Sequence, residues 1–178
     1  MRSRVALVRK QDDENKGKRM DIKLVLGLAV LLVGAGSAQA SALKDEVDRF
    51  NGLRSIEWLT MPARANTFAF KTTVLVPEKV EARQYYGYLF TYGQPGFATC
   101  NHTQWLIDGR RAPEIQTTYS RSGELEYFEL AKPEAMLPIL AAAKKVEFKV
   151  CGVEGEISSS DLDGIREVLD RAKQDMPR

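Results

Sequence analysis

An uninterrupted apolar run over residues 24–36 is the feature that most constrains this chain. The run contains only Leu, Val, Ala and Gly, and Lys23 stands directly before it. Its length is that of the apolar core of a secretory signal peptide, and it is short for a transmembrane helix, which needs roughly 20 apolar residues. The run therefore predicts export of everything that follows it, to the periplasm or to the outside of the cell.

The residues after the apolar run predict where the leader is removed. Ala38-Gln39-Ala40 has the small-x-small pattern that signal peptidase accepts, so we expect cleavage after Ala40. Ala40-Ser41-Ala42 also fits this pattern, and cleavage after Ala42 is the near alternative; an uncleaved anchor helix is a more distant one. The chain is thus interpreted as a signal peptide, residues 1–40, followed by a single domain, residues 41–178, without a membrane span after cleavage.

The charged residues before the apolar run are unusual for a leader. Met20-Asp21-Ile22-Lys23 would make a more usual start, so residues 1–19 are interpreted as a mis-assigned N-terminal extension, with a long natural leader as the alternative. Residues 1–40 hold 8 of the 26 basic and 4 of the 24 acidic side chains, which leaves 18 and 20 and a net charge of −2 for the domain. A domain without excess cations is not expected to bind nucleic acid.

The chain contains two cysteines, Cys100 and Cys151, and both follow the leader. Two cysteines in an oxidising compartment most simply pair, and closing a loop of this length stabilises the folded state by about 4 kcal/mol. Two alternatives stay open at this point. The thiols could be free and buried, or Cys100 could be a reactive thiol served by His102, which would point the same way along a strand.

Residue patterns predict an α+β fold. Leu43, Val47 and Phe50 recur at spacings of four and three, which predicts a short N-terminal amphipathic helix. Alternation, β-branched content and turn signals predict strands over residues 54–61, 67–76, 85–92, 97–107, 112–119, 125–130 and 145–151. Residues 97–107 are expected to run back beside 85–92, and Asp108-Gly109 predicts a tight hairpin.

Two further helices are expected towards the C-terminus. A helix begins near Pro133, and Pro138 is expected to divide it. The last helix begins at one of three serines, 158–160, and carries an apolar stripe formed by Leu162, Ile165, Leu169, Ala172 and Met176. We therefore expect a mostly antiparallel sheet of about five to six strands, with the C-terminal amphipathic helix packed on one face.

One strand carries the best candidate for a binding surface. Tyr86, Tyr88, Phe90 and Tyr92 alternate along residues 85–92 and share one face. Tyrosine offers a flat apolar ring with a polar tip, so such a face could stack on sugar rings or bind a peptide. The favoured interpretation is that this face packs beneath the terminal helix, and the binding surface is the alternative.

The hairpin at Asp108-Gly109 also carries charge. Arg110 and Arg111 follow its turn. Such a tip is usually only solvated, but its guanidinium groups are candidates to bind a carboxylate or phosphate through paired hydrogen bonds.

Residue types for catalysis and metal binding are scarce. His102 is the only histidine, which excludes a site with two or three histidines from one chain, and a zinc site would need both cysteines and compete with their disulfide. There is no Gly-x-Ser-x-Gly elbow and no glycine-rich phosphate loop, so no cofactor or metal is expected. Glu124 and Glu126 are placed on one strand face and are a candidate carboxylate pair.

These observations favour a small exported protein that is not an enzyme and that binds another protein or a component of the cell envelope. The alternative is a small periplasmic hydrolase that uses carboxylates or a Cys100–His102 pair. A third possibility is a structural subunit whose apolar face completes an assembly.

Overall fold

The computed structural model describes residues 41–77, 82–93 and 96–174. The leader, the extension over residues 1–19 and Met176 at the end of the predicted stripe lie outside the described residues. Within these ranges, no helix has the length and apolar character needed to cross a membrane.

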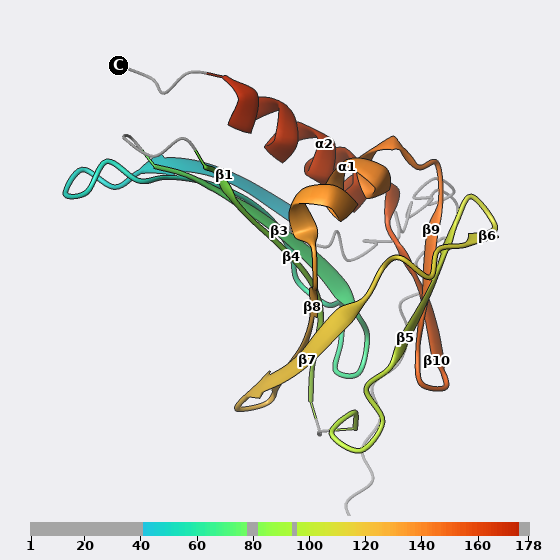
Figure 1. Cartoon of the computed structure of the whole chain (residues 1–178). Coiled ribbons are helices and arrows are strands. Elements are labelled where there is room, and N and C mark those ends of the chain that lie inside the picture. The colour runs from blue at the N-terminus through green and yellow to red at the C-terminus, as the bar shows by residue number, and fades with distance from the viewer. Residues whose placement is uncertain (1–40, 78–81, 94–95, 175–178) are drawn as a thin grey trace, which may run out of the picture. The chain divides into compact units, whose positions relative to one another are not determined.

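The described residues form two antiparallel sheets and two helices (Figure 1). In spatial order, the six-stranded sheet consists of β1 (Ser41–Val47), β2 (Arg54–Thr60), β3 (Ala69–Val76), β4 (Gln84–Tyr92), β8 (Leu125–Leu130) and β7 (Thr117–Ser122). The four-stranded sheet consists of β10 (Val153–Ile157), β9 (Val146–Val150), β5 (Thr103–Ile107) and β6 (Arg110–Arg111). The helices are α1 (Pro133–Ala142) and α2 (Ser159–Lys173).

The expected antiparallel strands and C-terminal helix are present, but the strands form two sheets and not the single sheet that was predicted. The ranges 54–61, 67–76, 85–92, 125–130 and 145–151 are confirmed as β2, β3, β4, β8 and β9. The predicted single sheet is corrected to two sheets, because residues 97–107 do not pair with β4. Both sides of β4 are already occupied, by β3 and β8, and β5 pairs instead with β9 and β6.

The segment after β5 also differs from its prediction. Asp108 and Gly109 do form the tight hairpin, with φ values of 50° and 77° that suit a two-residue turn of this kind. The expected return strand over residues 112–119 is wrong for most of its length. The strand that returns from the hairpin, β6, ends at Arg111, residues 112–116 are not in a strand, and residues 117–119 belong to β7 of the other sheet. The chain thus crosses from one sheet to the other between these two strands.

The predicted N-terminal helix is wrong, because residues 41–47 form the edge strand β1. Leu43 and Val47 lie on one face of β1 together with Asp45, while Lys44 points to the other. A spacing of four residues puts two side chains on the same face of either a helix or a strand, so this pattern could not distinguish them. Phe50, which completed the helical pattern, lies in the turn after β1.

The predicted division at Pro138 is also wrong, because α1 is continuous through it. The carbonyl that loses its hydrogen-bond partner to this proline belongs to Glu134, and Glu134 and Pro138 are both exposed. Water can therefore satisfy that carbonyl.

Both helices and the four-stranded sheet lie on the same side of the six-stranded sheet, which we call its inner face (Figure 1). Val168 and Ala172 of α2 pack with Ile56 and Val74. A second cluster joins Leu162 and Ile165 of α2 to side chains from both sheets and from α1, namely Phe70, Leu89, Phe128, Trp105, Phe148, Val146, Leu137 and Leu140. The core of the domain therefore lies between the inner face and these three elements.

A polar clamp attaches the N-terminal end of α2 to β2. Ser158 caps the helix by accepting the backbone N–H of Asp161 at 3.1 Å, which confirms the serine cap. The buried Asp161 carboxylate accepts the indole N–H of Trp58 at 2.9 Å and the hydroxyl of Thr60 at 2.6 Å. One carboxylate thus links the helix cap to two side chains of the inner face.

A second clamp attaches the other end of α2. Arg54 is buried, and its Nε and Nη2 donate to the two carboxylate oxygens of Asp45 at 2.7 Å each. Its Nη1 donates to the carbonyl of Gln174, the C-terminal cap of α2, at 3.2 Å. Arg171 of the helix also donates to Asp45, at 3.4 Å. The hydrogen bonds from Arg54 hold the pKa of the Asp45 carboxyl below its ordinary value.

Gly164 lets the helix approach the sheet closely. A Cβ at this position would lie 2.1 Å from Cδ2 of the Trp58 ring. The ring cannot easily give way, because its N–H is bonded to Asp161. Glycine normally costs about 1 kcal/mol relative to alanine in a helix, and here the close packing of the indole requires it.

Replacing Gly164 with alanine is expected to destabilise the domain, although helix propensity alone predicts a gain. Overpacking against the held indole should lower the free energy of unfolding by about 1–3 kcal/mol. Gly152→Ala is the matched control, because a Cβ there meets nothing within 4 Å. Denaturant unfolding of both variants measures the effect, and a Gly164→Ala protein at least as stable as wild type would contradict the packing.

Replacing Asp45 with asparagine should destabilise the domain at pH 7 by about 3 kcal/mol, because it leaves the buried Arg54 guanidinium without its counter-charge. The folded-state pKa of Asp45 is lowered, so the carboxylate stabilises the fold above the ordinary pKa of about 4 and loses that effect as the pH falls further. The difference between wild type and variant should therefore shrink below pH 4. Denaturant unfolding over a pH series measures it, with the exposed neighbour Glu46→Gln as control; a constant difference would contradict the linkage.

Candidate binding site on the outer sheet face

The face opposite the helices, which we call the outer face, carries a strip of aromatic side chains. Tyr85, Gly87 and Leu89 of β4 point inwards, as their pairing with inner-face residues of β3 shows, so the alternate residues point outwards. The strip consists of Tyr86, Tyr88, Phe90 and Tyr92 of β4 and Tyr127 of β8, and we call it the tyrosine strip. The interpretation that this face of β4 packs beneath the terminal helix is therefore wrong, because α2 packs on the inner face.

Gly87 explains how β4 can be covered so closely on its inner side. A Cβ at Gly87 would lie 2.7 Å from Leu130 and 3.2 Å from Leu137 of α1. The helix and β8 thus fill the space that a larger residue at this position would need. Of the aromatic residues of β4, Tyr85 lies on the inner face and the other four lie on the outer face.

The rings of the strip contact one another in sequence. Tyr86 and Tyr88 have ring centroids 6.3 Å apart and planes within 3° of parallel. Tyr127 contacts Tyr88 edge-on at 6.1 Å and Phe90 at 6.1 Å with planes 25° apart. Phe90 is buried, with 4% of its surface exposed, whereas the four tyrosines are half-buried. The exposed part of the strip therefore consists of the tyrosine rings, with Tyr86, Tyr88 and Tyr127 in contact and Tyr92 further along β4.

Polar side chains border the strip on both sides. The register places Thr73 opposite Tyr86, and Lys71 and Glu129 on the two sides of Tyr88. Lys71 pairs with Glu57 at 2.6 Å. Burial, with the neighbouring Glu129 carboxylate adding to it, raises the pKa of Tyr88, so its hydroxyl keeps its proton at neutral pH and can donate a hydrogen bond.

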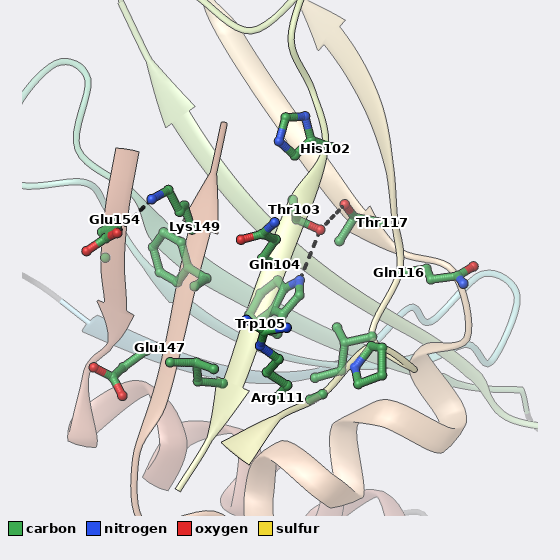
Figure 2. Close-up of a pocket in the computed structure, with 16 residues that line it drawn as sticks. His102, Thr103, Gln104, Trp105, Arg111, Gln116, Thr117, Glu147, Lys149 and Glu154 are labelled. Carbon is green, nitrogen blue, oxygen red and sulfur yellow. Dashed lines mark hydrogen bonds and ion pairs between the residues drawn. The ribbon is translucent and has the colours of Figure 1, made fainter. Parts of the chain in front are cut away.

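A groove of about 800 Å³ lies along the four-stranded sheet and residues 111–117 (Figure 2). Arg111 lines it, whereas Arg110 is exposed beside it and is not part of the lining. Its labelled side chains include charges of both signs, and Lys149 is paired with Glu154 at 2.9 Å. The two arginines named from the sequence are therefore separated from the tyrosine strip, which lies on the other sheet.

The predicted disulfide is confirmed: Cys100 and Cys151 are bonded, with their Cα atoms 6.0 Å apart. The sequence pattern had placed both cysteines in strands, but neither lies in one. Cys151 lies in the turn between β9 and β10 with φ of 54°, and Cys100 precedes β5. The backbone N–H of Cys151 donates to the carbonyl of His102 at 3.1 Å, which holds the turn beside the start of β5.

The disulfide uses the sulfur atoms that two alternatives, a metal site and a reactive thiol, would require. Nδ1 of His102 lies 3.5 Å from Sγ of Cys100, and these atoms with Sγ of Cys151 lie within 4.8 Å of one another. A metal site or a reactive thiol would need thiolates, and both sulfurs are bonded to each other. The described residues include no free cysteine.

The candidate carboxylate pair is not brought together. Glu124 lies in the turn before β8 and is exposed. Glu126 is buried, and it accepts the backbone N–H groups of Gly96 and Phe97 at 3.1 and 3.0 Å and the hydroxyl of Tyr119 at 2.8 Å. Burial acts to raise the pKa of Glu126, but these hydrogen bonds outweigh it and lower the pKa. The carboxylate therefore anchors the loop before the disulfide.

Tyr127 is the member of the strip that the sequence analysis missed. Tyr127 points to the outer face, whereas its neighbours Glu126 and Phe128 point inwards. Only the pairing of β8 with β4 places it beside Phe90, and the sequence did not predict that pairing.

Comparison of the chain with models of protein families, with curated proteins and with solved structures found no match. The geometry of this chain is thus the basis for its functional interpretation.

Proposed function

We propose that this protein is exported to the periplasm or secreted, and that it binds another protein or an envelope component through the tyrosine strip without acting as an enzyme. The observation that carries the proposal is the position of the strip. Four half-buried tyrosines, together with the buried Phe90, lie on the outer face. Figure 1 shows that both helices and the second sheet lie on the opposite, inner side of the six-stranded sheet.

The tyrosine rings of the strip are partly exposed to water, and a bound ligand would bury them further. Half-buried aromatic rings that meet water lose hydrophobic stabilisation that a partner would restore, and contiguous apolar patches rimmed by polar groups are typical of interaction sites. Tyrosine is also among the residue types enriched at binding interfaces. Among the described elements, those that pack on the six-stranded sheet lie on its inner face.

Export is supported by the apolar run over residues 24–36 and by the disulfide. Disulfides persist in oxidising compartments and are rare in the cytosol. The first described strand bears on the choice of cleavage site, because Ser41 pairs with Thr60 at the start of β1. Cleavage after Ala40 leaves this strand whole, whereas cleavage after Ala42 removes its first two residues.

The alternative of a hydrolase has less support. Its Cys100–His102 version needs a thiolate from a sulfur that is in the disulfide. Its carboxylate version needs two available carboxyl groups across a cleft, and Glu126 is engaged by three hydrogen-bond donors. The binding function therefore remains our proposal.

Capture from envelope extracts tests the binding function. Immobilised wild-type protein should retain a component that the Tyr86→Ala/Tyr88→Ala variant releases, because truncation of central aromatic contacts commonly costs tenfold or more in affinity. Phe50→Ala is the matched control, since Phe50 is 84% exposed but lies in the turn after β1, away from the strip. Equal capture by a folded double variant would contradict a role for the strip.

N-terminal sequencing of the exported protein tests the processing. We expect the mature chain to begin at Ser41, because that start keeps all of β1 for pairing with β2. A chain recovered with residues 20–40 intact would contradict cleavage, and a start at Leu43 would show that the second small-x-small pattern is used instead.

A further inference from the structure

We propose that the ligand of the tyrosine strip is a polysaccharide of β-linked pyranose rings. This inference rests on the binding function proposed above and names the chemical class of the ligand. Such a chain presents alternating apolar ring faces of C–H bonds and an equatorial rim of hydroxyl groups. A binding surface for it needs flat aromatic rings next to hydrogen-bonding side chains, and both are present on the outer face.

The aromatic part of the surface is extended along one strand. Tyr86 and Tyr88 have nearly parallel rings, Tyr127 lies edge-on to Tyr88, and Tyr92 lies further along β4. Phe90 is buried and packs against Tyr127, so it supports the surface without being exposed on it. A β-strand rises about 3.3 Å per residue, so the strip from residue 86 to residue 92 extends for about 20 Å. That length suits a ligand of several consecutive rings better than a single small molecule.

The hydrogen-bonding part lies beside the rings. The Tyr86 hydroxyl donates to the side-chain oxygen of Gln84 at 3.1 Å and keeps its own oxygen as an acceptor, and Gln84 is exposed. Lys71 and Glu129 flank Tyr88, and supply a donor and an acceptor on the two sides of the strip. Sugar hydroxyls both donate and accept, so this mixed border matches them.

Position and charge argue against other ligands. A peptide that adds a strand needs an open sheet edge, but both edges of β4 are paired, with β3 and β8. An anionic ligand needs excess cations, and the ammonium group of Lys71 is paired with Glu57 while Glu129 adds a further negative charge. An aromatic surface without excess charge, away from the sheet edges, therefore favours an uncharged polysaccharide.

Titration with two soluble probes tests the inference. Hexamers of β-1,4-linked N-acetylglucosamine and of β-1,4-linked glucose are added to the exported protein in a calorimeter. At least one hexamer should bind wild type and Phe50→Ala equally, and bind Tyr86→Ala/Tyr88→Ala about tenfold more weakly or not at all. Absence of binding to both hexamers, or equal binding by the double variant, would overturn the proposal.

A measurement on wild type keeps the test independent of how the double variant folds. In NMR spectra, the ring signals of the tyrosine strip should shift on addition of the bound hexamer, while those of Phe50 and of Tyr119 on the inner face stay constant. Shifts confined to residues outside the strip would count against the proposal.

The two proposals fail differently. If a component of envelope extracts is captured through Tyr86 and Tyr88 but neither hexamer binds, the polysaccharide assignment is wrong and the binding function stands. If neither the extracts nor the hexamers yield a ligand that depends on these residues, the binding function fails as well.

Discussion

The arrangement of the domain depends on the two polar clamps that hold α2 against the inner face. Asp161 links the helix N-terminus to Trp58 and Thr60 of β2, and Asp45 with Arg54 links its C-terminus to β1 and β2. Hydrophobic burial already favours the inner face, because β2 and β3 present Ile56 and Val74 there and mostly charged or polar side chains on the other side. It is non-directional, however, and does not fix the ends of the helix. Buried hydrogen bonds to a charged group are directional, and their loss costs more than their formation gains. The clamps thereby fix both ends of α2 on the inner face, and the tyrosine strip lies on the opposite side of the sheet.

Local features of the fold could be predicted from the sequence, and longer-range features could not. The alternation in β3 and β8, the hairpin at Asp108-Gly109 and the Ser158 cap are encoded by neighbouring residues, and the structure has each of them. The partner of each strand depends on residues far along the chain. Residues 103–107 join a second sheet because β8, which follows them, already occupies the free side of β4.

The same distinction applies to the candidate sites. The disulfide was predicted from the two cysteines and the expected compartment, although the expected strand positions of the cysteines were wrong. The alternation of Tyr86, Tyr88, Phe90 and Tyr92 correctly predicted that they share one face of their strand. The sequence analysis expected the terminal helix to cover that face, and this was wrong. A period of two defines the two faces of a strand but does not say which of them a distant helix covers. Trp58, whose indole packs on Gly164 and bonds to Asp161, carried no local signal of that role.

The disulfide crosslinks one of the two sheets and not the other. It joins the start of β5 to the turn between β9 and β10, both in the four-stranded sheet, whereas the six-stranded sheet relies on packing and the clamps. When the two cysteines are reduced, this bond is absent, and the four-stranded sheet opens more readily than that of the oxidised protein. If the domain is exported as proposed, the crosslink that closes the fold becomes available only after the chain has crossed the membrane, and the precursor stays easier to unfold for passage.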